Sequence, residues 1–371
     1  MSWSAQLRYS QVVTVQEDIS LAQYTTLGVG GPARWFVETS DEEEMLAAVR
    51  LARAQGVPHF VLGGGSNLLV SDDGFPGVVI HVSGGGSVWQ DEEKGFGNIV
   101  SAAGTEWDSV VRLAVEKNCA GIECLAGIPG SVGGTPVQNV GAYGQEVSRT
   151  ILSVRALDLE AEKVLNLTTE QCGFAYRSSI FNSSQKGRYI ITSVVYGLEV
   201  GGKPHLEYRD VKQFFQERGI AHPSVAETAE AVRAIRQRKG MLLVKGDADV
   251  HSAGSFFKNP VVPMEVVPRL AVLAHCRPDE VPQFPPGGGD VTGKTVKLSA
   301  AWLMELAGFH KGFAMGHAGI SSKHVLALIN RGGATASEIL ALRDAIVNAV
   351  YEKTSIRLVQ EPVMLGFAAP R

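Results

Sequence analysis

Cysteine is scarce in this sequence, and its spacing argues against several classes of protein. Only Cys119, Cys124, Cys172 and Cys276 occur among 371 residues, and no two of them form a C-x-x-C pair. Secreted disulfide scaffolds carry far more cysteine, and structural zinc sites use closely spaced ligands. We therefore expect a protein of a reducing compartment, the cytoplasm, without a disulfide framework.

Long apolar runs, metal-ligand spacings and a large net charge are also lacking. The sequence has no run of about 18 apolar residues, and its N-terminal segment lacks the basic and apolar blocks of a signal peptide. Its nine histidines form no H-x-x-x-H pair. The net charge of −4 is small and of the wrong sign for a polyanion-binding surface. We expect no membrane span, no metal and no nucleic-acid partner.

Glycine is the residue in excess. The chain has 42 glycines, about 11% of its residues against an average near 7%. Its apolar fraction of 45% and charged fraction of 19% are typical of a globular protein. At roughly 150 residues per domain, the length allows two or three domains. The placement of the glycines therefore carries more information than the overall composition.

Capping signals and hydrophobic periodicity predict a mixed architecture. Three capping-box spacings are present, at Ser40 and Glu43, at Ser224 and Glu227, and at Thr335 and Glu338. They predict helices over 41–55, from 225 towards Gly240, and from 336 to about 353, and periodicity adds helices over 106–118 and 299–307. Short β-branched runs predict strands at 35–38, 60–62, 78–82, 151–157 and 190–200. Because strands and helices do not alternate strictly, the fold class is α+β, not a regular doubly wound sheet.

The first glycine-rich segment, VLGGGSNLLV, places three glycines directly after an apolar strand. Gly63, Gly64 and Gly65 let a backbone approach a ligand closely, and successive N–H groups can form an anion-binding nest. The alternative is an ordinary tight turn between strands.

The second, GIPGSVGGTPVQNVGAYG, covers residues 127–144 and has six glycines. It is too poor in large apolar residues to be core, while Pro129 and Pro136 stiffen it. Such a loop suits phosphates and a flat ring, although neither segment is the G-x-G-x-x-G of a Rossmann unit. A long surface loop without function is the alternative, and loops of this length are uncommon.

Three further patterns invite a chemical interpretation. Gly288 and Gly293-Lys294-Thr295 match a phosphate-binding P-loop, but the proline-rich stretch before them is no buried strand, so we expect a chance match. In GSFFKNP, Ser255 is either a proton donor or a turn residue, and no G-x-S-x-G elbow surrounds it. A basic helix end carries Arg233, Arg236, Arg238 and Lys239, which suit either a solvated face or a pyrophosphate.

Taken together and in order, TTLGVGGPA, VLGGGSNLLV, GIPGSVGGTPVQNVGAYG, AYRSSIF, GSFFKNP, AGFHKGFAMGHAGISSKH and EPVMLG resemble the UDP-N-acetylenolpyruvoylglucosamine reductase (MurB) family. The resemblance covers almost the whole chain, from about Thr25 to Gly366. It implies an FAD-binding domain of the vanillyl-alcohol oxidase/PCMH type and a C-terminal substrate domain. The expected division is 1–82 completed by 355–371, then 83–222, then 223–354, with 356–366 returning as a strand to the first domain.

The resemblance also implies the chemistry. Members bind FAD non-covalently, take a hydride from NADPH and reduce the enolpyruvyl ether of UDP-N-acetylglucosamine to UDP-N-acetylmuramate, a peptidoglycan precursor. By matching motifs, Arg177 would stabilise charge on the substrate carboxylate, Ser255 would protonate the α-carbon, and Glu361 would assist from the other side. FAD would be bound by Gly63, Gly64, Gly65, Ser66, Asn67, Gly130, Ser131, Gly133, Gly134, Asn139, Gly141, Ala142 and Tyr143. The sugar nucleotide would contact Tyr208, Arg236, Lys239 and Asn259.

Three other functions remain open at this point. One is a different FAD enzyme of the same fold, such as an alcohol oxidase, whose reduced flavin would reoxidise rapidly with oxygen. Another is a binding protein without catalysis, which the presence of all three expected catalytic residues disfavours. The third is a P-loop phosphotransferase, which ATP binding abolished by Lys294→Ala would support.

Overall fold

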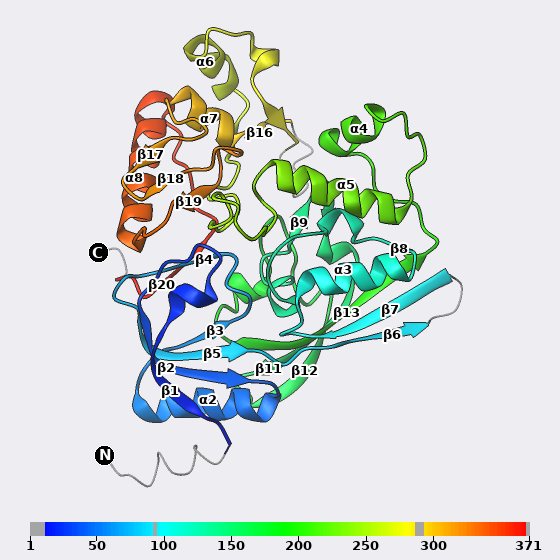
Figure 1. Ribbon diagram of the computed structural model, residues 1–371, viewed down its shortest axis with the longest axis vertical. Coiled ribbons are helices and arrows are strands. Elements are labelled where there is room, and N and C mark those ends of the chain that lie inside the picture. Colours follow the sequence, from blue (N-terminus) through cyan, green and yellow to red (C-terminus); the bar gives the residue numbers. More distant parts are fainter. Residues whose placement is uncertain (1–11, 92–94, 286–292, 369–371) are drawn as a thin grey trace. The chain divides into compact units, whose positions relative to one another are not determined.

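The computed structural model describes residues 12–91, 95–285 and 293–368. The chain divides into two compact units (Figure 1). The first consists of Met1–Ile19, Pro32–Gly65 and Phe75–Arg238, and the second of Ser20–Gly31, Ser66–Gly74 and Lys239–Arg371. Each unit has its own cluster of buried apolar residues. The three-domain division expected from the sequence stays a prediction, because compact units defined by contacts need not coincide with the domains of a family.

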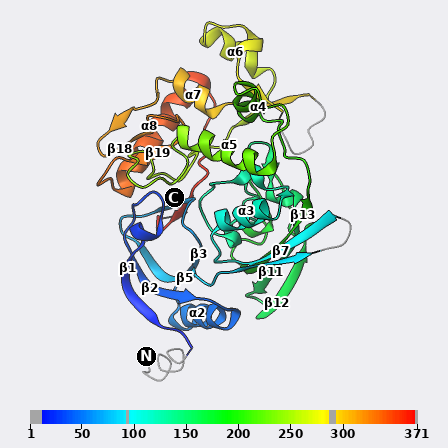
Figure 2. The ribbon, with the colours of Figure 1, turned by 45° about the vertical axis from the view of Figure 1, so that its right-hand side comes forward.

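A four-stranded sheet with the order β1-β2-β5-β3 lies at one end of the first unit (Figure 2). Its strands are β1 (Val15–Ser20), β2 (Pro32–Thr39), β3 (His59–Leu62) and β5 (Phe75–Val82). Strands β2 and β3 both run parallel to β5, and helix α2 (Glu42–Gln55) packs against β2 and β5. The helix buries Met45, Val49 and Ala52 on its inner side, as its apolar spacing predicts.

The ends of α2 show how local chemistry sets a helix boundary. Gly56 ends the helix with a left-handed φ of 63°, which favours glycine. At the other end, the carboxylate of Asp41 accepts a hydrogen bond from the N–H of Glu44 at 2.9 Å. The expected cap at Ser40 is therefore wrong by one residue: Ser40 instead donates its own N–H to the Glu44 carboxylate.

The larger sheet of the first unit is antiparallel, with strand order β12-β11-β13-β7-β6 and with β8 pairing to β13. Its strands are β6 (Ser87–Asp91), β7 (Phe96–Ala102), β8 (Cys119–Ala120), β11 (Ile151–Asp158), β12 (Lys163–Thr168) and β13 (Tyr189–Val200). A small hairpin, β9 (Gly141–Ala142) and β10 (Gln145–Glu146), forms at the end of the second glycine-rich segment. The helices are α3 (Trp107–Glu116), α4 (Arg209–Gln216) and α5 (Val225–Arg238). Fully buried Trp107 on α3 packs against fully buried Tyr196 on β13 with ring centroids 5.4 Å apart, which joins helix to sheet.

The described residues of the second unit form three small sheets and three α-helices. The sheets are β14-β16-β15 (Val261–Pro263, Thr295–Leu298 and Gln283–Phe284), β17-β18-β19 (Ala314–Met315, Ala318–Ile320 and Leu328–Asn330) and the parallel pair β4 and β20 (Leu68–Val70 and Val363–Leu365). The helices are α6 (Val266–Leu273), α7 (Ala300–Leu306) and α8 (Ala336–Thr354). Of the segment 356–366 expected to return as a strand, residues 363–365 form β20, which pairs in parallel with residues 68–70 of β4; its return to a first domain stays a prediction.

The P-loop pattern has the wrong setting for phosphate binding. Gly288 lies outside the described residues. Lys294 precedes β16, which begins at Thr295 and pairs antiparallel with β14, whereas a P-loop lysine and threonine must open a helix. This result agrees with the expected chance match.

Candidate functional site

The first glycine loop, residues 63–65, packs directly against the second glycine loop, residues 127–144. A Cβ atom added to Gly64 would lie 2.6 Å from the Cα of Gly130, and one added to Gly63 would lie 2.5 Å from the hydroxyl of Ser131. No side chain fits at Gly64, because backbone atoms lie in its way, whereas a side chain at Gly63 would require the Ser131 hydroxyl to move. The two loops that the sequence singled out separately thus form one surface of backbone and small side chains.

The second glycine loop is held firmly from beneath. The N–H groups of Val132 and Gly133 donate to the carbonyl oxygens of Thr105 and Ala103 at 2.9 and 2.8 Å. The hydroxyl of Thr135 lies 2.7 Å from that of Tyr196, whose ring is fully buried in the core. Because these bonds anchor the loop to β13 and to the connection between β7 and α3, the loop is fixed to the unit and is not a loose surface excursion.

The loop ends in a tight hairpin turn at Tyr143 and Gly144. Ala142 pairs with Gln145 across this two-residue turn, and its central residues have φ of 48° and 87°. Positive φ at both positions is the type I′ geometry, which normally takes asparagine, aspartate or glycine. A tyrosine there is strained by an amount on the order of 1 kcal/mol. Such strain persists only where the surroundings hold the residue in place.

Asn139 links this loop to the segment that carries Arg177. It also has a positive φ, 46°, and its amide nitrogen donates to the carboxylate of Glu146 and to the carbonyl oxygen of Ala175, both at 3.1 Å. Its amide oxygen accepts the N–H of Ser148 at 3.2 Å. The side chain is therefore engaged on both ends and ties three segments together.

Arg177 lies at the third position of a four-residue turn, 175–178. Ala175 and Ser178 exchange two main-chain hydrogen bonds, and Arg177 has a φ of 53°, at a position where glycine is usually preferred. Asn182 donates to the carbonyl oxygen of Arg177 at 3.3 Å, so the strained backbone is held from outside the turn. The side chain is half-buried. A charged residue in a strained turn is an observation from which a functional role is reasonably inferred.

In the second unit, the segments that contain Ser255 and Glu361 lie side by side. Glu361 donates its N–H to the carbonyl oxygen of Phe256 at 2.8 Å, and Phe257 forms a bridge with Gln360. Asn67 adds a contact from a third segment, donating from its amide to the carbonyl oxygen of Glu361 at 3.4 Å. Ser255 directly precedes fully buried Phe256 and Phe257, which fasten it to the core. Ser255 and Glu361, 106 positions apart in the sequence, are thus joined by one short ladder.

The four residues expected at the sugar nucleotide are found in different settings. Tyr208 directly precedes α4, without a capping hydrogen bond from its side chain, and packs edge-on against Tyr143, with ring centroids 5.3 Å apart. Arg236 is 5% exposed and belongs to the first unit, while Lys239 begins the second. Asn259 accepts the N–H of Ala300 with its amide oxygen at 2.9 Å, close to the start of α7. The substrate roles of these residues stay predictions.

Burial dominates the electrostatics around Tyr143. It raises the pKa of the Tyr143 phenol to about 12, although neighbouring Arg236 acts in the opposite direction. Burial also raises the pKa of the Tyr208 phenol and lowers that of the Arg236 guanidinium from its ordinary value. Both phenols stay protonated near pH 7, so each is available as a hydrogen-bond donor.

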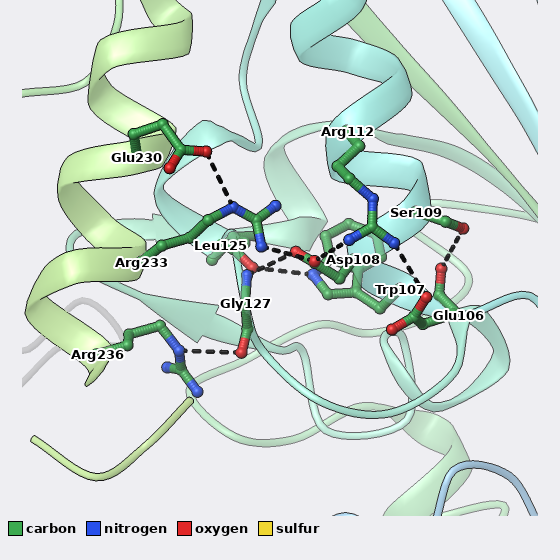
Figure 3. A network of polar contacts seen from close by, with 10 residues as sticks. All are labelled: Glu106, Trp107, Asp108, Ser109, Arg112, Leu125, Gly127, Glu230, Arg233 and Arg236. Atoms are coloured by element: carbon green, nitrogen blue, oxygen red, sulfur yellow. Dashed lines mark hydrogen bonds and ion pairs between the residues drawn. The ribbon is translucent and has the colours of Figure 1, made fainter. Parts of the chain in front are cut away.

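Sequence reasoning missed one group in this region. Asp108, in the first turn of α3, accepts the N–H of Gly127 at 2.7 Å, where the second glycine loop begins (Figure 3). Its other oxygen accepts from Arg112 and Arg233 at 2.8 and 2.6 Å. An acidic residue in the first turn of a helix is commonplace. No sequence signal therefore distinguished Asp108.

Neither a metal-binding cluster nor a membrane-spanning helix is found among the described residues. Within 12–91, 95–285 and 293–368, no cluster of three or more His, Cys, Asp or Glu side chains is arranged to hold a metal ion. In the same part of the chain, no helix has both the length and the apolar content to cross a membrane.

The donor groups of the two glycine loops fit a dinucleotide cofactor such as FAD. The close packing of Gly63 and Gly64 on Gly130 and Ser131 leaves a surface without bulky side chains, and a Cβ at Gly134 would meet no atom within 4 Å. Backbone N–H groups and small hydroxyls on such a surface suit phosphates.

Comparison with known proteins agrees with this geometry. A family model described as an FAD binding domain matches residues 33–168, and one described as the C-terminal domain of UDP-N-acetylenolpyruvoylglucosamine reductase matches residues 246–365. These matches confirm the expected α+β fold with an FAD-binding domain and a reductase C-terminal domain.

Individual relatives agree along most of their length. The reductase of Thermobifida fusca is 42% identical over 354 residues, covering 94% of this chain and 97% of that protein. The reductase of Nocardia farcinica is 43% identical, covering 95% and 90%. The crystal structure of the reductase (MurB) from Thermus caldophilus superposes with a TM-score of 0.60 at 27% identity, covering 95% of this chain and 98% of that one. The chain therefore belongs to the UDP-N-acetylenolpyruvoylglucosamine reductase family of FAD-dependent oxidoreductases.

Proposed function

We propose that the protein reduces the enolpyruvyl ether of UDP-N-acetylglucosamine to UDP-N-acetylmuramate with NADPH as the hydride donor. The observation that carries this proposal is the ladder joining Glu361 to the GSFFKNP segment, with the N–H of Glu361 2.8 Å from the carbonyl oxygen of Phe256. It places a hydroxyl and a carboxyl group in adjacent segments of one unit. The family relatives named as this reductase support the same substrate. Sugar nucleotide and NADPH are metabolites of the cytoplasm, where we place the reaction.

The cofactor is held by the two glycine loops. Hydride chemistry is the contribution of FAD when it is bound, and the protein orients the reactants and stabilises charge. Gly63, Gly64 and Gly65 supply backbone N–H groups, and Gly130, Ser131, Gly133 and Gly134 supply the facing surface. Asn139, Gly141, Ala142 and Tyr143 form the far end of the second loop, while Ser66 and Asn67 follow the first. Because Gly64 packs against the backbone of Gly130 with no room for a side chain, we take the backbone itself as the binding surface.

Three side chains act on the substrate. Hydride addition to the enolpyruvyl double bond leaves negative charge that spreads onto the carboxylate, and the planar guanidinium of Arg177 matches a carboxylate with two parallel hydrogen bonds. Ser255 then donates a proton to the α-carbon as general acid, which completes the saturated lactyl ether. Glu361 assists as a hydrogen-bonding partner of the developing enol.

Four residues are assigned to the sugar nucleotide. Lys239 supplies positive charge for the diphosphate, Asn259 supplies an amide and Tyr208 contributes a phenol; the family motifs assign Arg236 to the diphosphate as well, although its guanidinium donates to the carbonyl oxygen of Gly127. The assignment of these four residues follows the family motifs.

One spectroscopic experiment tests the proposal. Purified protein is expected to show the visible spectrum of bound flavin, to bleach on anaerobic addition of NADPH, and to recover on addition of the enolpyruvyl sugar nucleotide. UDP-N-acetylglucosamine without the enolpyruvyl group is the matched control and should cause no recovery. Recovery with oxygen alone at the same rate would point to an alcohol oxidase instead. A colourless protein that FAD does not reconstitute would overturn the proposal.

A further inference from the structure

Gly127, the first residue of the second glycine loop, is bound by charged side chains on both of its peptide groups. Its N–H donates to Asp108 at 2.7 Å, and its carbonyl oxygen accepts from the Nε of Arg236 at 3.1 Å (Figure 3). Gly127 has a positive φ of 72°, so the chain turns sharply here. Helices α3 and α5 therefore hold the start of the loop from two sides.

Arg236 also contacts the other end of the same loop. Its guanidinium forms a side-chain hydrogen bond with the phenol of Tyr143, the strained residue of the hairpin turn. One 5%-exposed side chain thus reaches Gly127 and Tyr143, 16 positions apart in the chain. A planar guanidinium suits this task, because its donors point in fixed and different directions.

Asp108 is itself kept charged and oriented by arginines. Burial opposes the charged form, but hydrogen bonds from Arg233 and Gly127 outweigh it and hold the pKa of the carboxyl group below its ordinary value. Arg233 and Arg236 are three residues apart on α5 and so lie on the same side of the helix. The side chains that hold Gly127 therefore belong to one connected network of charges.

We infer that Arg236, supported by Asp108, is a positioning residue that clamps the two ends of the second glycine loop and thereby retains FAD. This inference rests on the proposed function, because it takes the loop to be the cofactor site. It departs from the expectation that Arg236 contacts the sugar nucleotide. A guanidinium engaged with Gly127 and Tyr143 inside one unit acts on the loop and through it on the cofactor.

If Arg236 positions the glycine loop, its substitution should change FAD release, whereas if it binds the sugar nucleotide, its substitution should change the KM for that substrate. FAD release from the holoenzyme is followed by the rise of flavin fluorescence after dilution, and the KM for the sugar nucleotide is measured separately at saturating FAD. We expect Arg236→Gln to release FAD at least tenfold faster while the KM changes less than twofold. Arg238→Gln is the matched control, since Arg238 is an exposed arginine of the same helix end. It should leave the release rate unchanged.

A double-variant comparison separates clamping from a general loss of stability. Tyr143→Phe removes only the hydroxyl group that Arg236 contacts and keeps the ring that packs on Tyr208. It should speed FAD release in the wild-type background and add nothing in the Arg236→Gln background. Independent effects of the two substitutions, or a raised KM with unchanged FAD release, would overturn the inference. A wild-type protein that binds no FAD would instead contradict the proposed function.

Discussion

The side-chain amide of Asn139 donates a hydrogen bond to the main-chain carbonyl oxygen of Ala175 at 3.1 Å, across 36 positions of sequence. Asn139 belongs to the second glycine loop, and Ala175 begins the turn that holds Arg177. The backbone of both Asn139 and Arg177 lies in the left-handed region. This hydrogen bond therefore ties the residue expected to meet the substrate carboxylate to the loop expected to bind the cofactor.

Asn139→Asp tests this connection. Aspartate tolerates the positive φ and can still accept the N–H of Ser148, but it cannot donate to Ala175 and it repels Glu146. We expect turnover at saturating FAD to fall by about tenfold or more, since a displaced Arg177 loses well-oriented charge stabilisation. Steady-state kinetics measure this. Asn166→Asp, at an exposed position of β12, is the control, and an equal loss there would remove the special role of Asn139.

Substitutions at Arg177 should separate activity from stability. Arg177→Lys keeps the positive charge but loses the planar guanidinium with its two parallel N–H donors, so a large fall in turnover is expected. Arg177→Gly also abolishes turnover but relieves the strain at φ 53°, so stability should stay the same or rise by up to about 1 kcal/mol. Thermal unfolding and turnover are measured on the same preparations. Wild-type turnover in Arg177→Lys would contradict the proposal that the Arg177 guanidinium binds the substrate carboxylate with two hydrogen bonds.

Helix boundaries that depend only on residues adjacent in sequence could be predicted from the sequence. The Thr335–Glu338 capping box and the Gly56 stop gave correct helix ends, because both act within one turn of chain. At Ser40 the boundary shifted by one residue, since Ser40 and Asp41 both carry capping side chains. Helix α6 was missed because it contains Pro268, and proline usually interrupts a helix. In the first turn a proline is tolerated, because the N–H it lacks would have no partner within the helix.

The contacts between distant segments could not be predicted from the sequence. Both glycine loops were recognisable as candidates, but the close approach of Gly64 to Gly130 depends on how β3 and α3 are placed by the core. Helix α4 was also missed, because it is short and strongly charged and buries only Val211 and Phe215. Asp108 gave no signal for the same reason: its partner at Gly127 comes close only through tertiary structure.

Ser255→Ala should affect one half-reaction and not the other. Flavin reduction by NADPH needs no proton from Ser255 and should proceed nearly as in the wild type. Reduction of the enolpyruvyl sugar nucleotide should slow by about 10² to 10⁴, the usual contribution of a general acid. Rapid-mixing absorbance measurements follow each half-reaction separately. If both slow equally, Ser255 is not the proton donor.

The ion pair of Asp158 with Arg188 should make folding sensitive to acid. Hydrogen bonds from Arg188, one of them 2.7 Å long, lower the pKa of the buried Asp158 carboxyl group to about 2. A carboxyl group whose pKa is depressed on folding stabilises the protein above its unfolded pKa, and this contribution disappears as pH falls through the folded value.

Asp158→Asn should therefore lower the free energy of unfolding near pH 7 by roughly 1 kcal/mol, allowing for the partial exposure of Arg188. The difference from wild type should shrink between about pH 4 and pH 2. Urea unfolding followed by circular dichroism across this range measures both effects. Asp279→Asn, which removes an exposed partner of Arg277, should change stability far less. A difference for Asp158→Asn that persists unchanged at pH 2 would show that packing, and not charge, makes this residue stabilising.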